Sequence, residues 1–173
     1  NKVDTAPEEG VRQVEENIRR CNPKARIVYA ESPITVDDPA RIFGKRVLVV
    51  EDGPTLTHGE MPFGAATRAA RRVGAGSIAD ARPHAVGSIR EAYRKYPHIG
   101  PQLPALGYGE EQIRELEATI RAVDCDLVLF GTPTDLSRLL RIDKPCLRAR
   151  YEYRDHGPPL LEDILREDLN RLG

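Results

Sequence analysis

The apolar run VLVV at residues 47–50 limits the possible folds of this chain more than any other feature. Four consecutive aliphatic residues without polar alternation are typical of a strand that is buried on both faces of a parallel sheet. A second run of this kind, LVLF, occupies residues 127–130. Helical spacing of apolar residues appears before, between and after these runs, most clearly at 62–73, 86–96 and 109–123. The pattern predicts an α/β fold of three layers, with a mainly parallel sheet and helices on both faces.

Weaker patterns complete the expected order of elements. We expect short strands at 27–30, 77–79 and 146–151, and amphipathic helices at 11–21 and 160–169. The segments 51–61 and 97–108 are rich in Gly, Pro and polar residues, so both are expected to be loops.

Charge and cysteine content exclude several classes of protein. The 26 basic and 27 acidic residues give a net charge of −1, so no overall basic surface for nucleic acid is expected. No apolar run approaches the roughly 20 residues that a membrane helix needs. Cys21, Cys125 and Cys146 are odd in number and far apart, which favours reduced thiols in a cytoplasmic protein.

The chain opens with Asn1-Lys2-Val3-Asp4, an N-K-x-D motif. In P-loop GTPases this motif recognises guanine, and its aspartate accepts hydrogen bonds from the edge of the base. Ser32, which follows the strand expected at 27–30, joins Asn1, Lys2 and Asp4 as a candidate for nucleotide binding. The alternative is a simple turn that leads into a helix. The chain contains no G-x-x-x-x-G-K-[ST] phosphate loop, so a nucleotide site would need an amino-terminal part that is missing here.

Ligands of parallel sheets bind beyond the carboxyl ends of the strands, which places the loop after the strand 47–50 in a candidate site. Thr55, Thr57 and Gly59 are expected to contact a phosphorylated substrate, while the following helix offers free N–H groups to an anion. His58 is a candidate general acid or phosphate ligand. Glu51 and Asp52 are candidate ligands of Mg²⁺. The alternative is a turn stabilised by its own polar side chains, with His58 in solvent.

Four further residues extend this prediction. Arg82 is a candidate anion clamp, with a surface ion pair to Asp80 as the alternative. Ser88, at the start of a helix, and His98, in a Pro/Gly loop, are candidates for substrate binding. Thr132 follows the strand 127–130 and belongs to the same set.

Long segments of the chain resemble the cyclic 2,3-diphosphoglycerate synthetase family, whose shorter members are often described as P-loop GTPases. The resemblance rests mainly on EDGPTLTHG and YPHIGPQLPALGYG, and also on NKVDTAPEEGV, ARPHAVGSIREAY and GTPTDLSRLL. It implies that residues 1–45 are the last part of a P-loop NTPase-like domain and that this part begins at the N-K-x-D motif. Residues 46–173 would then form a carboxyl-terminal α/β region that binds substrate and phosphate.

The resemblance also implies a reaction. ATP or GTP with Mg²⁺ would drive closure of an intramolecular phosphoanhydride in a small phosphorylated substrate, with His58 and Arg82 as catalytic residues. The chain alone would be inactive without its amino-terminal part. The alternatives are a GTPase of unknown partner and a non-catalytic binding half, and a homodimer is left open.

Overall fold

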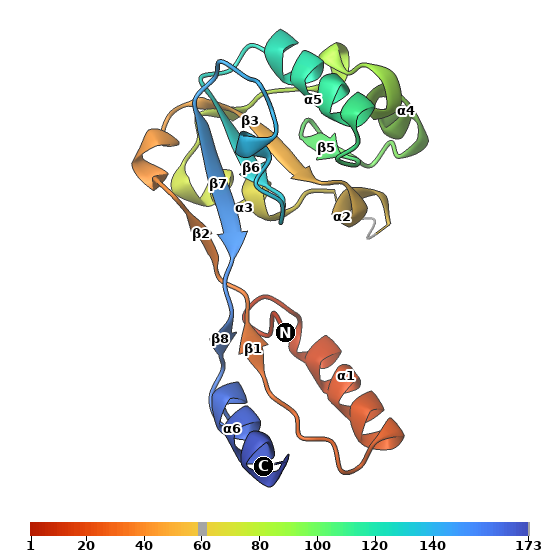
Figure 1. Cartoon of the computed structure of the whole chain (residues 1–173), viewed down its shortest axis with the longest axis vertical. Coiled ribbons are helices and arrows are strands. Elements are labelled where there is room, and N and C mark those ends of the chain that lie inside the picture. Colours follow the sequence, from red (N-terminus) through yellow and green to blue (C-terminus); the bar gives the residue numbers. More distant parts are fainter. Residues whose placement is uncertain (59–61, 173) are drawn as a thin grey trace. The chain divides into compact units, whose positions relative to one another are not determined.

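The structure is a computed structural model that describes residues 1–58 and 62–172. The chain forms two compact units, shown with their elements in Figure 1. Unit 1 combines Asn1–Pro33 with Tyr151–Gly173, and unit 2 is the continuous segment Ile34–Arg150. Each unit is described by itself below.

Unit 2 is built on a sheet with the strand order β2-β7-β6-β3-β4, and β5 lies beside the carboxyl half of β3. The central strand β3 pairs in parallel with β4, β5 and β6, and β6 pairs in parallel with β7. The strands are β2 (Ile34–Val36), β3 (Arg46–Asp52), β4 (Ser77–Ile78), β5 (Leu103–Ala105), β6 (Leu127–Gly131) and β7 (Cys146–Tyr151).

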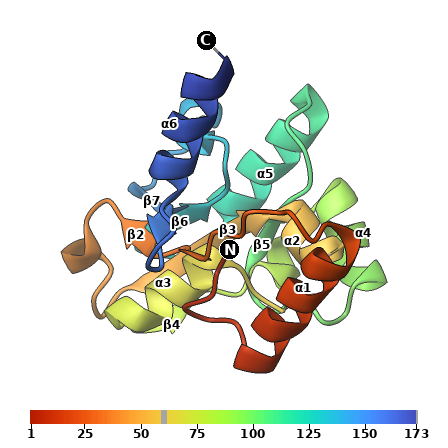
Figure 2. The ribbon, with the colours of Figure 1, turned by 90° about the horizontal axis from the view of Figure 1, so that it is seen from below.

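Helices cover both faces of this sheet. The helices of unit 2 are α2 (Gly53–Thr57), α3 (Ala65–Val73), α4 (Gly87–Lys95) and α5 (Glu110–Ala122). Short 3₁₀ turns lie at Pro39–Arg41, Arg82–His84 and Leu136–Arg138. Figure 2 shows α3 and α5 on opposite faces of the sheet. Gly74 ends α3 in the left-handed conformation, with a φ of 85°, which suits a residue without a side chain.

The side chains of β3 alternate between two apolar clusters. Val47 and Val49 pack with the buried alanines of α3, whereas Leu48 and Val50 pack with residues of α4 and α5. All four are completely buried. The same alternation holds for β6, because Leu127 and Leu129 belong to the first cluster and Val128 and Phe130 to the second. The predicted α/β fold, with a mostly parallel sheet between helices, is confirmed.

The described residues of unit 1 form two helices and one small sheet. The helix α1 spans Glu8–Cys21, and α6 spans Leu161–Leu172. The strands β1 (Ala30–Glu31) and β8 (Arg154–Asp155) pair in antiparallel fashion.

Three expectations about local structure are wrong. The segment 51–61 is not only a loop, because α2 begins directly after β3. The segment 97–108 contains the buried strand β5. The sequence does not reveal it, because Pro104 and Ala105 have poor intrinsic strand propensity and the segment becomes a strand by pairing with β3. The strand expected at 27–30 begins only at its last residue, because β1 spans Ala30–Glu31.

Candidate functional site

In unit 1, the first residues of the chain are bound to Ser32. The side-chain oxygen of Asn1 accepts hydrogen bonds from the Ser32 hydroxyl, at 2.6 Å, and from the backbone N–H of Lys2, at 2.8 Å. One carboxylate oxygen of Asp4 accepts a hydrogen bond from the backbone N–H of Ser32, at 3.3 Å. The structure therefore brings together the N-K-x-D residues and Ser32, which lies 28 positions after Asp4.

The motif itself is folded into a tight turn. The backbone oxygen of Lys2 accepts hydrogen bonds from the N–H groups of Thr5 and Ala6, and Lys2 has a φ of 64°. The Lys2 ammonium lies 4.4 Å from the centre of the Tyr151 ring, a cation–π contact. Asn1, Lys2 and Asp4 are exposed. Their polar groups are thus both oriented by the turn and open to a ligand.

In unit 2, the loop after β3 forms a compact polar turn around α2. The Thr55 hydroxyl donates to a carboxylate oxygen of Asp52, at 3.1 Å, and the Thr57 hydroxyl donates to the backbone oxygen of Gly53, at 3.0 Å. The Thr57 hydroxyl also lies 2.9 Å from Nδ1 of His58. A Cβ atom at Gly53 would lie 2.3 Å from the backbone oxygen of Ala105, so only glycine allows the start of α2 to lie this close to β5.

Glu51 is completely buried at the end of β3, and its carboxylate caps α3. It accepts hydrogen bonds from the backbone N–H groups of Gly64, Ala66 and Thr67 and from the Thr67 hydroxyl, at 2.7–3.3 Å. Burial raises the pKa of Glu51, and the bonds from Thr67, Ala66 and Gly64 act in the opposite direction. The expectation that this helix presents free N–H groups to an anion is wrong, because Glu51 already occupies them.

This capping role also bears on the predicted Mg²⁺ site. Glu51 would have to give up bonds to α3 in order to bind a metal ion, whereas Asp52 is half-buried and accepts a side-chain hydrogen bond from Thr55. Asp52 is therefore the better candidate of the pair. Among residues 1–58 and 62–172, no group of three or more His, Cys, Asp or Glu side chains is arranged to hold a metal ion.

Two distant residues join the same edge of the sheet. Thr132 directly follows β6, whose last residue, Gly131, lies opposite Glu51 in the parallel register. Thr132 is buried, and its hydroxyl donates to the backbone oxygen of Thr134. Nε2 of His98 lies 2.8 Å from the backbone oxygen of Leu56 in α2. The carboxyl ends of β3 and β6 thus gather Glu51, Asp52, Thr55, Thr57, His58, His98 and Thr132.

Arg82 and Ser88 have other partners. The Arg82 guanidinium donates to both carboxylate oxygens of Asp80, which holds the pKa of Asp80 below its ordinary value. This is the surface pair that the sequence left as the alternative. Ser88, at the start of α4, is hydrogen-bonded through its N–H and hydroxyl to the Glu115 carboxylate of α5. Within the described residues, no hydrogen bond or ion pair joins either residue to the turn around α2. Gly59 lies outside the described residues.

Sequence reasoning missed Gln102, which is buried beside this edge. Its side-chain amide donates to the backbone oxygen of Pro62, and its backbone oxygen accepts a hydrogen bond from the Tyr93 hydroxyl, at 2.7 Å. Burial also raises the pKa of Tyr93. Gln102 stands in a segment with no apolar periodicity, so nothing in the sequence marks it as buried.

The fold and these two polar loops define an α/β protein with candidate ligand-binding loops in each unit. Comparison with known proteins adds a relative. The chain is 53% identical over 167 residues to the arginine synthetase ArcE of Thermococcus kodakarensis. The match covers 96% of this chain and 37% of that protein, so the chain spans little more than a third of its relative.

Other comparisons give no further relationship. No family model matches the chain, and no solved structure matches it. The resemblance to cyclic 2,3-diphosphoglycerate synthetases stays a prediction. No helix within the described ranges is long and apolar enough to cross a membrane.

Replacing Glu51 by alanine tests the capping role. Glu51→Ala would leave buried N–H groups of α3 without an acceptor, and we expect it to lower the free energy of unfolding by about 3 kcal/mol. Urea unfolding followed by circular dichroism measures the change. The matched control is Glu91→Ala, because Glu91 is exposed on α4 and forms a surface ion pair with exposed Arg94. A Glu51 variant as stable as this control would contradict the capping role.

Proposed function

We propose that this chain is the part of a nucleotide-dependent synthetase that holds the base of the nucleotide and contributes one side of the substrate site. The observation that carries the proposal is the bonding of Ser32 to both Asn1 and Asp4. The similarity to an arginine synthetase supports the synthetase class, because synthetases couple bond formation to the consumption of a nucleotide.

The exposed carboxylate of Asp4 favours guanine over adenine. Its Ser32 bond fixes one oxygen and leaves the group facing solvent as an acceptor. The guanine edge presents two adjacent donors, N1–H and the 2-amino group, which match a carboxylate. The adenine edge presents an acceptor at N1, which would face the Asp4 carboxylate without a proton between them. We therefore propose GTP as the nucleotide, with ATP as the alternative.

The polar turn around α2 is the proposed place of the substrate. Thr55, Thr57 and His58 can donate hydrogen bonds to phosphate or carboxylate oxygens once they leave their local partners. Asp52 is the residue that would hold Mg²⁺, which when bound neutralises phosphate charge. Phosphoryl transfer needs such positioning and charge neutralisation more than covalent help from the protein. Arg82 could contribute only after it releases Asp80.

Two reactions are compatible with this arrangement. The relative's name makes arginine the product of that protein, and we propose an amino-acid product of this class here. The resemblance described above instead suggests closure of a phosphoanhydride in 2,3-diphosphoglycerate. Both reactions would draw on the nucleotide as phosphoryl donor, so we propose the same loops as the site for either one.

An assay of the reverse reaction distinguishes these two proposals, because it needs only the product arginine and not the unidentified precursor of arginine. The polypeptide encoded by the complete reading frame is incubated with arginine, phosphate and GDP or ADP, and formation of the nucleoside triphosphate is measured. We expect triphosphate that depends on arginine. In the second arm, 2,3-diphosphoglycerate is incubated with GTP or ATP, and release of phosphate together with a cyclic product would favour the phosphoanhydride reaction. Hydrolysis that depends on neither compound would contradict the synthetase proposal and favour a GTPase.

The base site is tested by Asp4→Asn. The amide of asparagine can donate to the 2-oxo group of xanthine but cannot accept both guanine donors, so we expect affinity for GTP to fall at least about tenfold and affinity for xanthosine triphosphate to rise. Thermal shifts of the complete polypeptide with each nucleotide report both changes.

The control for this variant is Glu8→Gln, which removes one exposed negative charge four residues further on without touching the motif. It should leave the order of nucleotide preference unchanged. If Asp4→Asn also leaves that order unchanged, the turn has only a structural role.

A further inference from the structure

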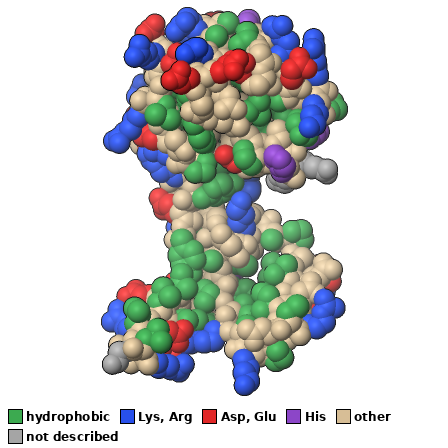
Figure 3. Space-filling model, turned by 45° about the vertical axis from the view of Figure 1, so that its right-hand side comes forward, with side chains coloured by type: hydrophobic (Ala, Val, Ile, Leu, Met, Phe, Trp, Pro, Cys, Tyr) green, Lys and Arg blue, Asp and Glu red, His purple; other side chains and the backbone are tan. Residues whose placement is uncertain are grey.

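Unit 1 has almost no core of its own. In residues 1–33 and 151–172, the buried residues are Ala30, Ser32 and Ile164, and both apolar clusters of the chain lie in unit 2. Figure 3 shows hydrophobic side chains on the visible face of unit 1. A unit of this size normally buries more than half of the surface of its unfolded chain, so its stability requires apolar surface from elsewhere.

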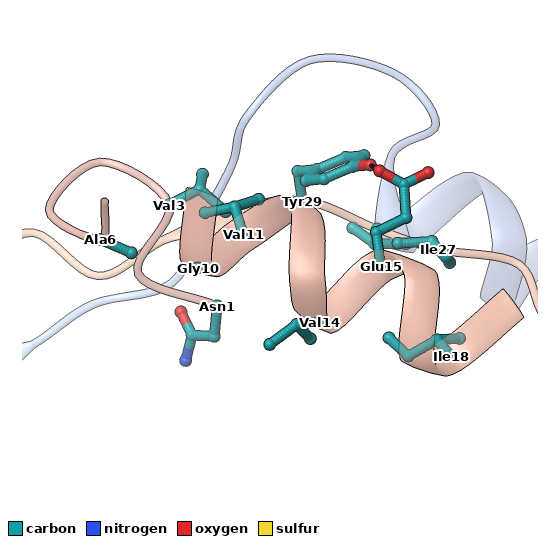
Figure 4. A pocket seen from close by; sticks show the side chains of 11 residues that line it. Asn1, Val3, Ala6, Gly10, Val11, Val14, Glu15, Ile18, Ile27 and Tyr29 are labelled. Atoms are coloured by element: carbon teal, nitrogen blue, oxygen red, sulfur yellow. Dashed lines mark hydrogen bonds between the residues drawn. The ribbon is translucent and has the colours of Figure 1, made fainter. Parts of the chain in front are cut away.

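The helix α1 has an apolar face that is not covered by other described residues of unit 1. Val11, Val14 and Ile18 form one apolar stripe, yet no residue of this 14-residue helix is buried and Val14 is 59% exposed. The stripe lines a cavity of about 150 Å³ together with residues 27–29, as Figure 4 shows. An amphipathic helix gains most of its stability from packing its apolar face, so this face lacks its natural cover.

The extended segment beside α1, residues 27–30, has backbone groups that are only partly hydrogen-bonded. The backbone oxygens of Tyr29 and Ala30 accept hydrogen bonds from the N–H groups of His156 and Val3. In the part of the chain that the structure describes, the backbone groups of Ile27 and Val28 make no hydrogen bond. These two apolar residues thus form an open edge at which a further strand could pair.

We propose that a segment of the same polypeptide, from the part of an ArcE-like protein outside the 167 matched residues, pairs with residues 27–28 and packs beneath α1. The matched region is 37% of the relative, so ample chain exists in such a protein to supply the segment. Because the exposed face of α1 and residues 27–28 are aliphatic, the segment that covers them is expected to be a strand with aliphatic side chains. A second copy of this chain would have to offer the same incomplete edge. The proposal is independent of the nucleotide.

Hydrogen exchange tests the proposal. Amide exchange is measured for the 173-residue chain and for the polypeptide encoded by the complete reading frame, with the masses of both in solution determined alongside. We expect the amides of Ile27, Val28 and α1 to exchange at least about a hundredfold more slowly in the complete polypeptide. The amides of α5, which packs inside unit 2, should exchange at similar rates in both.

Val14→Glu provides an independent variant, and Gln13→Glu is its matched control, because Gln13 is exposed and lies outside the apolar stripe of α1. Because Val14 is largely exposed in the 173-residue chain, its replacement should leave the circular dichroism of that chain unchanged. In the complete polypeptide, Val14→Glu should remove the added protection and lower the melting temperature by about 4 °C or more, whereas Gln13→Glu should do neither.

Four results would overturn the proposal. One is a reading frame that holds no further segment, and another is equal exchange of these amides in both polypeptides. The third is protection that appears in the 173-residue chain at high concentration together with a dimer mass, since a second copy would then be the cover. Added protection in a monomeric complete polypeptide that survives Val14→Glu would likewise assign it to another surface.

Discussion

The parallel pairing of β3 with β6 is the constraint on which unit 2 depends. Five residue pairs are in register, from Val47 opposite Leu127 to Glu51 opposite Gly131. Because both strands are covered on both faces, a shift of one residue would exchange the clusters on the two sides of the sheet. The register therefore also decides which polar residues leave the sheet together, and it sets Asp52 and α2 close to Thr132.

Glu51 connects this packing to the polar edge. It is the last residue of β3 in the register with β6, but its side chain is a carboxylate that holds the start of α3. A buried carboxylate is costly unless it is fully hydrogen-bonded, and here four donors supply the bonds. The strand end is thus fixed by a polar contact, while the loop after it keeps its own, weaker set of local bonds.

The sequence predicts the parts of the fold that carry their own pattern. The runs at 47–50 and 127–130 and the helical stripe at 109–123 mark β3, β6 and α5, and the rule for parallel sheets correctly places Asp52 and Thr132 at one edge. The strand β5 has no such pattern, because its pairing with β3 is a tertiary effect. The cap by Glu51 joins residues 13 to 16 positions apart across a loop, so no local pattern predicts it. For Arg82, the sequence allowed either an anion clamp or an ion pair with Asp80, and charge alone could not distinguish the two.

The small residues of α3 have a consequence for how this protein can change over time. Ala65, Ala66, Ala69 and Ala70 are all buried, and a Cβ atom at Gly131 would lie 2.7 Å from that of Ala66 and 2.8 Å from a Glu51 oxygen. The helix α3 therefore packs very close to the sheet. A larger residue at any of these positions would push α3 away from the Glu51 carboxylate that caps it. Substitutions between α3 and the sheet should therefore be coupled. Related sequences should either keep these alanines, Gly131 and Glu51, or replace them together.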